Sequence, residues 1–127
     1  MSNRIGNIAI YVDDLERSLA FYEGVLGLDV LARIDTPDVR ETIVGRSDGG
    51  SSIALTQAKH PTPQTVARPD GFWKIYIDAS DVERTFADAV AAGAPGEREP
   101  FVLEQYAVKL AFVRDPDGHL IELGQRT

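Results

Sequence analysis

The sequence predicts an α+β fold made of two tandem βαβββ modules, and three observations carry this prediction. Two stretches of the chain repeat in the same order, since residues 10–13 return as 75–78 and residues 15–20 return as 82–87. A proline-rich stretch separates the two copies. Each copy also has one helical pattern followed by several short β-branched runs. An ordered internal repeat of this kind indicates a duplicated structural unit.

The length and the position of the repeat predict the domain organisation. The chain has 127 residues, enough for one ordinary domain, which we expect to span residues 1–127. Prolines at positions 61, 63 and 69 indicate a linker. The expected parts are module one over 1–58, the linker over 59–71 and module two over 72–127.

Module one is expected to begin with a strand over residues 5–12, where apolar and β-branched residues dominate. Asp13 and Asp14 follow as candidates for a helix N-cap. Apolar residues then recur with helical spacing from Leu15, and Gly27 stands where a helix C-cap belongs. Three strand patterns follow, at residues 28–34, 40–45 and 52–56.

Module two is expected to repeat this order. A strand over 73–78 precedes a helix over 82–92 that ends at Gly93. The run 97–99, Glu-Arg-Glu, is interpreted as solvated loop, and residues 115–118, Asp-Pro-Asp-Gly, as the turn between the last two strands. The remaining strands are predicted near 101–103 and at 108–114 and 120–123.

Composition narrows the classes of partner. Thirteen Lys and Arg against 20 Asp and Glu give a net charge of −7, which disfavours nucleic acid and anionic membrane surfaces as partners. The chain has no cysteine, which excludes disulfides and thiolate metal sites. No secretory leader or membrane-spanning run is visible, so a cytoplasmic protein is expected.

Two motifs give the sequence a family resemblance. Phe21-Tyr22 is followed by Val-Leu-Gly-Leu over 25–28, and Asp-Pro-Asp-Gly over 115–118 is followed by Ile-Glu-Leu over 121–123. Together these are similar to the vicinal oxygen chelate superfamily, which includes glyoxalase I, extradiol dioxygenases and bleomycin-binding resistance proteins. The resemblance implies a curled mixed sheet around a cavity, with the modules paired within one chain or across a homodimer.

The resemblance also implies where metal ligands would stand: on the first and last strand of each module. Aligned on the strand-end Val12 and Ile77, the first-strand positions are Asn7 and Phe72. The last-strand positions are Ala54 and Glu122. Only Glu122 keeps a usual metal-binding side chain, because Phe and Ala cannot coordinate and Asn offers only a neutral oxygen. We therefore expect no metal ion and no other cofactor.

The remaining nucleophile and ligand candidates are interpreted as structural. His119 has the strand parity of Ile121 rather than of Glu122, and His60 lies in the linker, so both are interpreted as surface polar residues. Ser47 stands in a G-x-S-x-G match, but between two strand patterns rather than at a strand-to-helix turn, so a nucleophile is not expected.

Strand parity predicts an aromatic and apolar cup with two ionisable groups, Glu122 and Lys74. Glu122 is a candidate general base, and Lys74 is a candidate to hold a substrate carboxylate or to pair with Glu122. The structural alternatives are a Glu122 hydrogen-bonded to a neighbour and a Lys74 that extends to the rim. Trp73 is expected on the opposite face, against the helix. The expected ligand-binding residues are Asn7, Tyr11, Ala54, Thr56, Phe72 and Tyr76.

Three functions fit these residues. The first is a glyoxalase- or bleomycin-resistance-like protein with a degenerate metal site that binds a small organic ligand in a metal-free cavity. The second is a metal-independent isomerase, epimerase, lyase or cyclase that uses Glu122 as general base, with Lys74 or Asn7 steadying an oxyanion. The third is a metal-dependent glyoxalase or dioxygenase, which the missing ligands disfavour.

Overall fold

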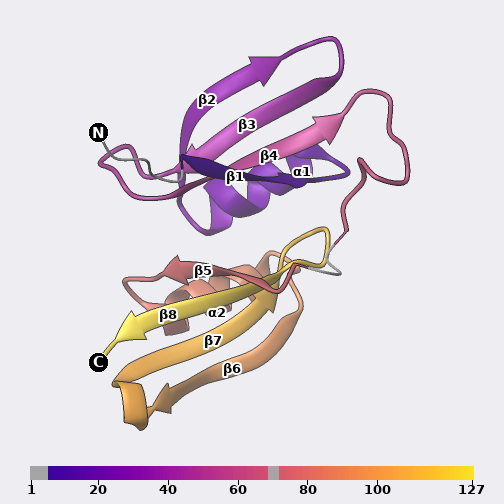
Figure 1. Cartoon of the computed structure of the whole chain (residues 1–127). Helices are drawn as coiled ribbons and strands as arrows, with labels where there is room; N and C mark the ends of the chain where they lie inside the picture. The colour runs from indigo at the N-terminus through magenta and orange to yellow at the C-terminus, as the bar shows by residue number, and fades with distance from the viewer. Residues whose placement is uncertain (1–5, 69–71) are drawn as a thin grey trace. The chain divides into compact units, whose positions relative to one another are not determined.

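The computed structural model describes residues 6–68 and 72–127 and has the βαβββ order twice (Figure 1). The expected strand start at Ile5 and the end of the linker at 69–71 lie outside the described residues. The chain divides into two compact units, Met1–Arg68 and Pro69–Thr127. Each unit contains one four-stranded mixed sheet, which confirms the predicted α+β class. No helix within the described ranges is long and apolar enough to cross a membrane.

Module one is built on the strand order β1-β4-β3-β2, with β1 parallel to β4 and the other pairs antiparallel. Its helix begins where the sequence predicts, because the Asp14 side chain accepts the backbone N–H of Arg17. After one turn the helix continues as a π-helical segment, η1, and the chain turns at Gly27 with φ +73°. The elements are β1 (Asn7–Tyr11), α1 (Leu15–Leu19), η1 (Ala20–Val25), β2 (Asp29–Asp35), β3 (Val39–Gly45) and β4 (Ser52–Ala58).

Module two repeats this plan with the strand order β5-β8-β7-β6. The interpretation of residues 97–99 as loop is wrong, because they belong to β6 and are exposed there. Two register shifts between β6 and β7 break the alternation of side chains, which hid the strand from pattern reading. The elements are β5 (Lys74–Asp78), α2 (Val82–Ala91), β6 (Gly96–Leu103), a 3₁₀ turn η2 (Glu104–Tyr106), β7 (Val108–Arg114) and β8 (Leu120–Arg126).

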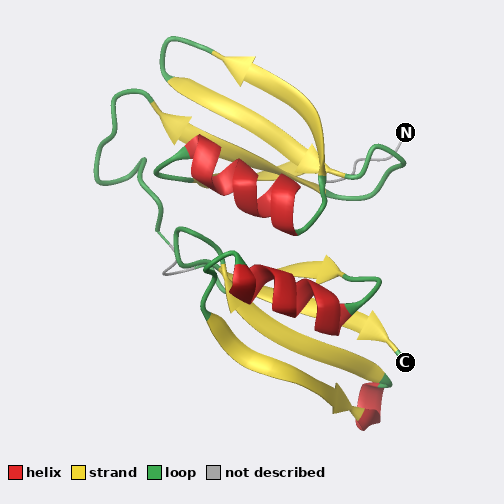
Figure 2. Cartoon of the chain, turned by 180° about the vertical axis from the view of Figure 1, so that it is seen from behind, coloured by secondary structure: helices red, strands yellow, loops and turns green. Residues whose placement is uncertain are grey.

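In each module the helix covers one face of the sheet and leaves the other face free of helices (Figure 2). In each module, a glutamine on the last strand holds the start of the helix against the sheet. Gln57 accepts the N–H of Leu15 at 2.8 Å, and Gln125 accepts the N–H of Val82 at 2.9 Å. The fully buried side chains of the two helix-side cores include Val12, Tyr22, Val44, Leu55, Val82, Val113, Ile121 and Leu123.

Candidate functional site

The strand registers show which residues of the two modules are equivalent. On the first strand of module one, Asn7 pairs with Ser52 and Ala9 pairs with Ala54. On the first strand of module two, Lys74 pairs with Leu120 and Tyr76 pairs with Glu122. Since Ala54 and Glu122 are the matching residues of the last strands, the counterpart of Asn7 is Lys74. The first-strand alignment that made Phe72 the counterpart of Asn7 is therefore wrong by two residues.

The helix N-caps give the same equivalence independently. Asp14 caps α1 and Asp81 caps α2, each by accepting an N–H three residues along the chain. Asn7 stands 14 − 7 = 7 residues before its cap, and Lys74 stands 81 − 74 = 7 residues before its cap. A slip of two residues keeps each side chain on its own face of the sheet, so hydrophobic alternation does not detect it. Counting back from the cap does detect it.

Lys74 and Glu122 form an ion pair on the helix-free face of module two. The Lys74 Nζ donates to Glu122 Oε1 at 2.7 Å, and the two side chains are only 10% and 12% exposed. Of the alternatives left open for Lys74, the structure shows the pairing with Glu122 and not a side chain that extends to a solvated rim, and Glu122 is hydrogen-bonded to a neighbour, as its structural alternative supposed. Three aromatic rings surround the ammonium, with centroids 3.9 Å (Trp73), 4.7 Å (Tyr76) and 5.7 Å (Phe112) from Nζ.

The electrostatic environment keeps Lys74 charged. Burial acts to lower its pKa, but hydrogen bonds to Glu122 and Tyr76 and the charge of Glu122 outweigh it, so the pKa is raised above 10.5. An ammonium with a raised pKa is a poor nucleophile at neutral pH but a permanent positive charge. Lys74 therefore remains positively charged at neutral pH and balances the negative charge of Glu122.

Trp73 and Phe112 are site residues that strand parity did not identify. Trp73 is 74% exposed and lies against Lys74, so its predicted packing on the helix side is wrong. The physical reason is that β5 begins at Lys74. Trp73 precedes the strand, so the alternation of side chains between the two faces does not determine where its side chain points. Phe112 is paired with Glu122 across β7 and β8, and only a correct pairing of those strands would have found it.

The helix-free face of module one carries different groups. Thr56 donates to Glu41 Oε2 at 2.6 Å and pairs with Tyr11 on β1. Ala54 and Thr56 are buried, whereas Tyr11 is 37% exposed. This module therefore presents a neutral hydroxyl and a carboxylate where module two presents an ammonium, a carboxylate and aromatic rings.

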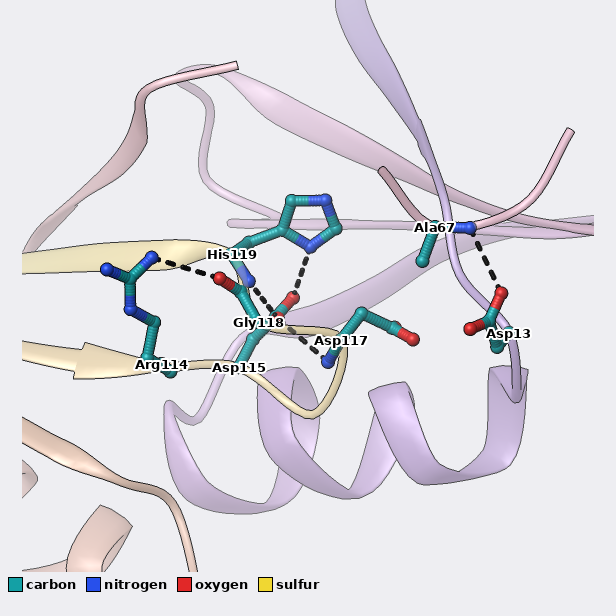
Figure 3. Close-up of polar contacts among 7 residues, drawn as sticks. All are labelled: Asp13, Ala67, Arg114, Asp115, Asp117, Gly118 and His119. Carbon is teal, nitrogen blue, oxygen red and sulfur yellow. Dashed lines mark hydrogen bonds and ion pairs between the residues drawn. The ribbon is translucent and has the colours of Figure 1, made fainter. Parts of the chain in front are cut away.

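The second buried polar cluster of module two is built on the turn before β8 (Figure 3). His119 is 2% exposed, so its interpretation as a surface residue is wrong. Its Nδ1 lies 2.9 Å from Asp115 Oδ2, and its backbone N–H donates to Asp115 Oδ1 at 2.7 Å. Phe72, expected on the ligand side, packs its ring against this imidazole, with a centroid distance of 5.8 Å. His60 is exposed, and Ser47 lies in the turn between β3 and β4.

Figure 3 also shows how the linker is attached within module one. The backbone N–H of Ala67 donates to Asp13 Oδ1 at 3.0 Å. Asp13 follows β1 and precedes α1, so this bond ties the end of the described linker to the start of the helix.

The positions at which the family resemblance implies metal ligands offer few metal donors in either module. The four equivalent positions hold Asn7, Ala54, Lys74 and Glu122, and the one carboxylate among them is already bound to an ammonium. Within the ranges 6–68 and 72–127, no three His, Asp or Glu side chains are grouped so that they could hold a metal ion. Three or four donors are the usual requirement of a protein zinc site.

Comparisons with known proteins agree with this fold. A family model described as the Glyoxalase/Bleomycin resistance protein/Dioxygenase superfamily matches residues 4–123. A probable lactoylglutathione lyase of Vibrio cholerae is 30% identical over 128 residues, which cover 98% of this chain and 93% of that protein.

Two solved structures show the same architecture. Glyoxalase I from Zea mays is 25% identical with a TM-score of 0.78, and the match covers 94% of this chain but only 43% of the maize chain. An antibiotic binding protein from a Streptomyces strain is 22% identical with a TM-score of 0.77, over 100% of this chain and 99% of that one. At that identity the second likeness shows the fold alone.

Proposed function

Because the chain belongs to the glyoxalase/bleomycin resistance protein/dioxygenase superfamily, we propose that it binds a small organic molecule without a metal ion. The observation that carries this proposal is the ion pair of Lys74 and Glu122. Through this pair, a lysine of the same chain balances the charge of Glu122. Glu122 is the only carboxylate among the four positions at which the family resemblance implies metal ligands. The ligand lies on the helix-free face of module two, in contact with Trp73 and Tyr76.

The exposed rings favour a planar ligand. Trp73 and Tyr76 are 74% and 64% exposed, although both are large apolar side chains that are costly to leave in water. Stacking on a flat ligand would bury both rings. The adjacent ion pair is neutral as a whole, so a neutral aromatic ligand with one or two polar groups fits better than a strongly charged one.

Tryptophan fluorescence tests this proposal at the site itself, because Trp73 is the only tryptophan of the chain. A panel of planar aromatic compounds with neutral, anionic and cationic members is titrated against the metal-free protein. We expect a neutral member to change the Trp73 emission and to raise the melting temperature. Trp73→Phe should remove the signal and weaken binding. Binding that appears only after a divalent metal is added would contradict the proposal.

A second candidate is a metal-independent isomerase, epimerase, lyase or cyclase with Glu122 as general base. It is favoured by one feature: Glu122 Oε2 accepts no hydrogen bond from the described residues, while Oε1 is held by Lys74. Glu122→Gln separates the two functions, because an enzyme would lose turnover and keep most of its ligand affinity. A binding protein would have no turnover to lose.

The metal-dependent reading rests on relatives named as lactoylglutathione lyases. An assay for that activity, with and without added Ni²⁺ and Zn²⁺, is expected to show none. A homodimer, as the family resemblance implies, belongs to the same proposal, and light scattering of the untagged protein tests it.

A further inference from the structure

Lys74 is the module-two counterpart of Asn7. It lies diagonally across β5 and β8 from Glu122, whose direct partner on β5 is Tyr76. First-strand and last-strand positions of one module therefore contact each other directly, through an Nζ–Oε1 bond of 2.7 Å. In module one the same two positions hold Asn7 and Ala54, a pair without charge.

A metal ion and this ammonium would compete for the same carboxylate group. A carboxylate oxygen approaches a bound transition metal to about 2.0–2.2 Å, which is closer than the ammonium nitrogen lies now. Placing a dication there would also bring two positive centres within a few ångströms inside aromatic surroundings. Lys74 would have to leave its three ring contacts before both oxygens of Glu122 became available.

We propose that Lys74 is a built-in substitute for a metal ion, supplying from within the chain the positive charge that Glu122 requires and closing the module-two positions to divalent cations. The inference deepens the proposed function and rests on its metal-free part. According to this inference, Lys74 alone excludes divalent cations from Glu122. Replacing Lys74 should therefore allow a divalent cation to bind there.

The test replaces the ammonium with a metal-binding side chain. Purified untagged wild type, Lys74→His and Lys59→His are titrated with NiCl₂ by calorimetry, with folding checked by circular dichroism. Lys59 is the matched control, because it is also a lysine paired with a carboxylate, that of Asp35, but on the exposed surface of module one. We expect Lys74→His to bind Ni²⁺ at least about tenfold more tightly than wild type, and Lys59→His to match wild type.

A second measurement covers the case in which Lys74→His does not fold. In Lys74→Gln the carboxylate loses its counter-charge but no new ligand is added. Paramagnetic broadening by Mn²⁺ in NMR spectra should then appear around Glu122 in this variant and be absent there in wild type. Equal broadening, or no gain of Ni²⁺ affinity in a folded Lys74→His, would overturn the inference. Either result leaves the proposed function standing if the planar ligand still binds metal-free wild type.

Discussion

The two modules share their scaffold and differ in their sites. Both helices begin at an aspartate that accepts an N–H from the first turn, Asp14 in module one and Asp81 in module two. Both are tied to the last strand by a glutamine that accepts an N–H at the start of the helix, Gln57 and Gln125. These contacts recur at the same register, so the duplicated sequence has kept the interactions that orient helix on sheet.

The helix-free faces show the opposite trend. Module one has Asn7 and Ala54 where module two has Lys74 and Glu122, and a side-chain hydrogen bond on this face joins Thr56 to Glu41. The ion pair and its three aromatic neighbours therefore belong to module two, whereas module one presents a carboxylate bonded to a hydroxyl. The comparison teaches that the backbone-fixing residues and the site residues of a duplicated fold diverge independently.

The largest expected difference between the modules comes from the ion pair. Lys74→Met should lower the free energy of unfolding by about 3 kcal/mol, because it leaves the carboxylate of Glu122 buried without a counter-charge. The double variant Lys74→Met/Glu122→Leu should recover most of this loss. Urea denaturation of the three proteins measures both effects.

The control for this prediction lies in module one. Lys59→Met breaks a comparable pair with Asp35, but there the side chains are 33% and 70% exposed. Its effect should stay below about 1 kcal/mol, because water and salt screen exposed pairs. Similar losses at the two pairs would mean that Lys74 and Glu122 are solvated in the native protein.

Removing either helix cap is expected to cause a smaller loss of stability, and the loss should be the same in the two modules. Asp14→Ala and Asp81→Ala should each cost about 1 kcal/mol, since each removes the acceptor of one otherwise unpaired N–H in the first helical turn. Thermal melts of the two variants measure the losses, and Asp88→Ala on the exposed side of α2 is the control. A loss at one cap only would show that the scaffold is less symmetric than its contacts.

The smallest effect is a difference in pH response. In module one, hydrogen bonds from the Ser47 backbone and side chain hold the pKa of Asp29 below 3.8. Its contribution to stability is present above pH 3.8 and is lost as the pH falls through the lowered pKa. In module two the pKa of Lys74 lies above 10.5, so its contribution is complete below pH 10.5 and is lost as the pH rises through the raised pKa.

Melting temperatures across both ranges test these opposite signs. Asp29→Asn should flatten the acid limb and leave the alkaline limb unchanged. Lys74→Met should flatten the alkaline limb. If Asp29→Asn changed the alkaline limb instead, the assignment of the two responses would fail.

The sequence was sufficient to predict the fold, because its signals are local and repeated. Helix starts at Asp14 and Asp81, helix ends at Gly27 and Gly93, and the period-two strands other than β6 are visible in the residue pattern. The same periodicity made the first-strand alignment slip by two residues, since that shift leaves every side chain on its face. As a result Lys74 was placed among the lining residues and not at the position equivalent to Asn7.

Other features depend on contacts that no local pattern contains. His119 is buried because Asp115, four residues earlier, folds back onto its ring and its backbone N–H, and alternation alone does not reveal that contact. The π-helical segment after Leu19 places Phe21 and Tyr22 side by side in the interior, with rings 5.2 Å apart. Strand alternation did not place Trp73 on the helix-free face, because Trp73 precedes β5 by one residue.

Elemental analysis of the untagged protein, purified without chelator, tests the central claim most directly. If Lys74 is the permanent counter-charge of Glu122, the purified protein should contain no stoichiometric Zn, Ni, Mn or Fe, and added metal should not raise its melting temperature. One bound metal ion per chain, with a matching rise in melting temperature, would contradict the account and make Glu122 its first candidate ligand.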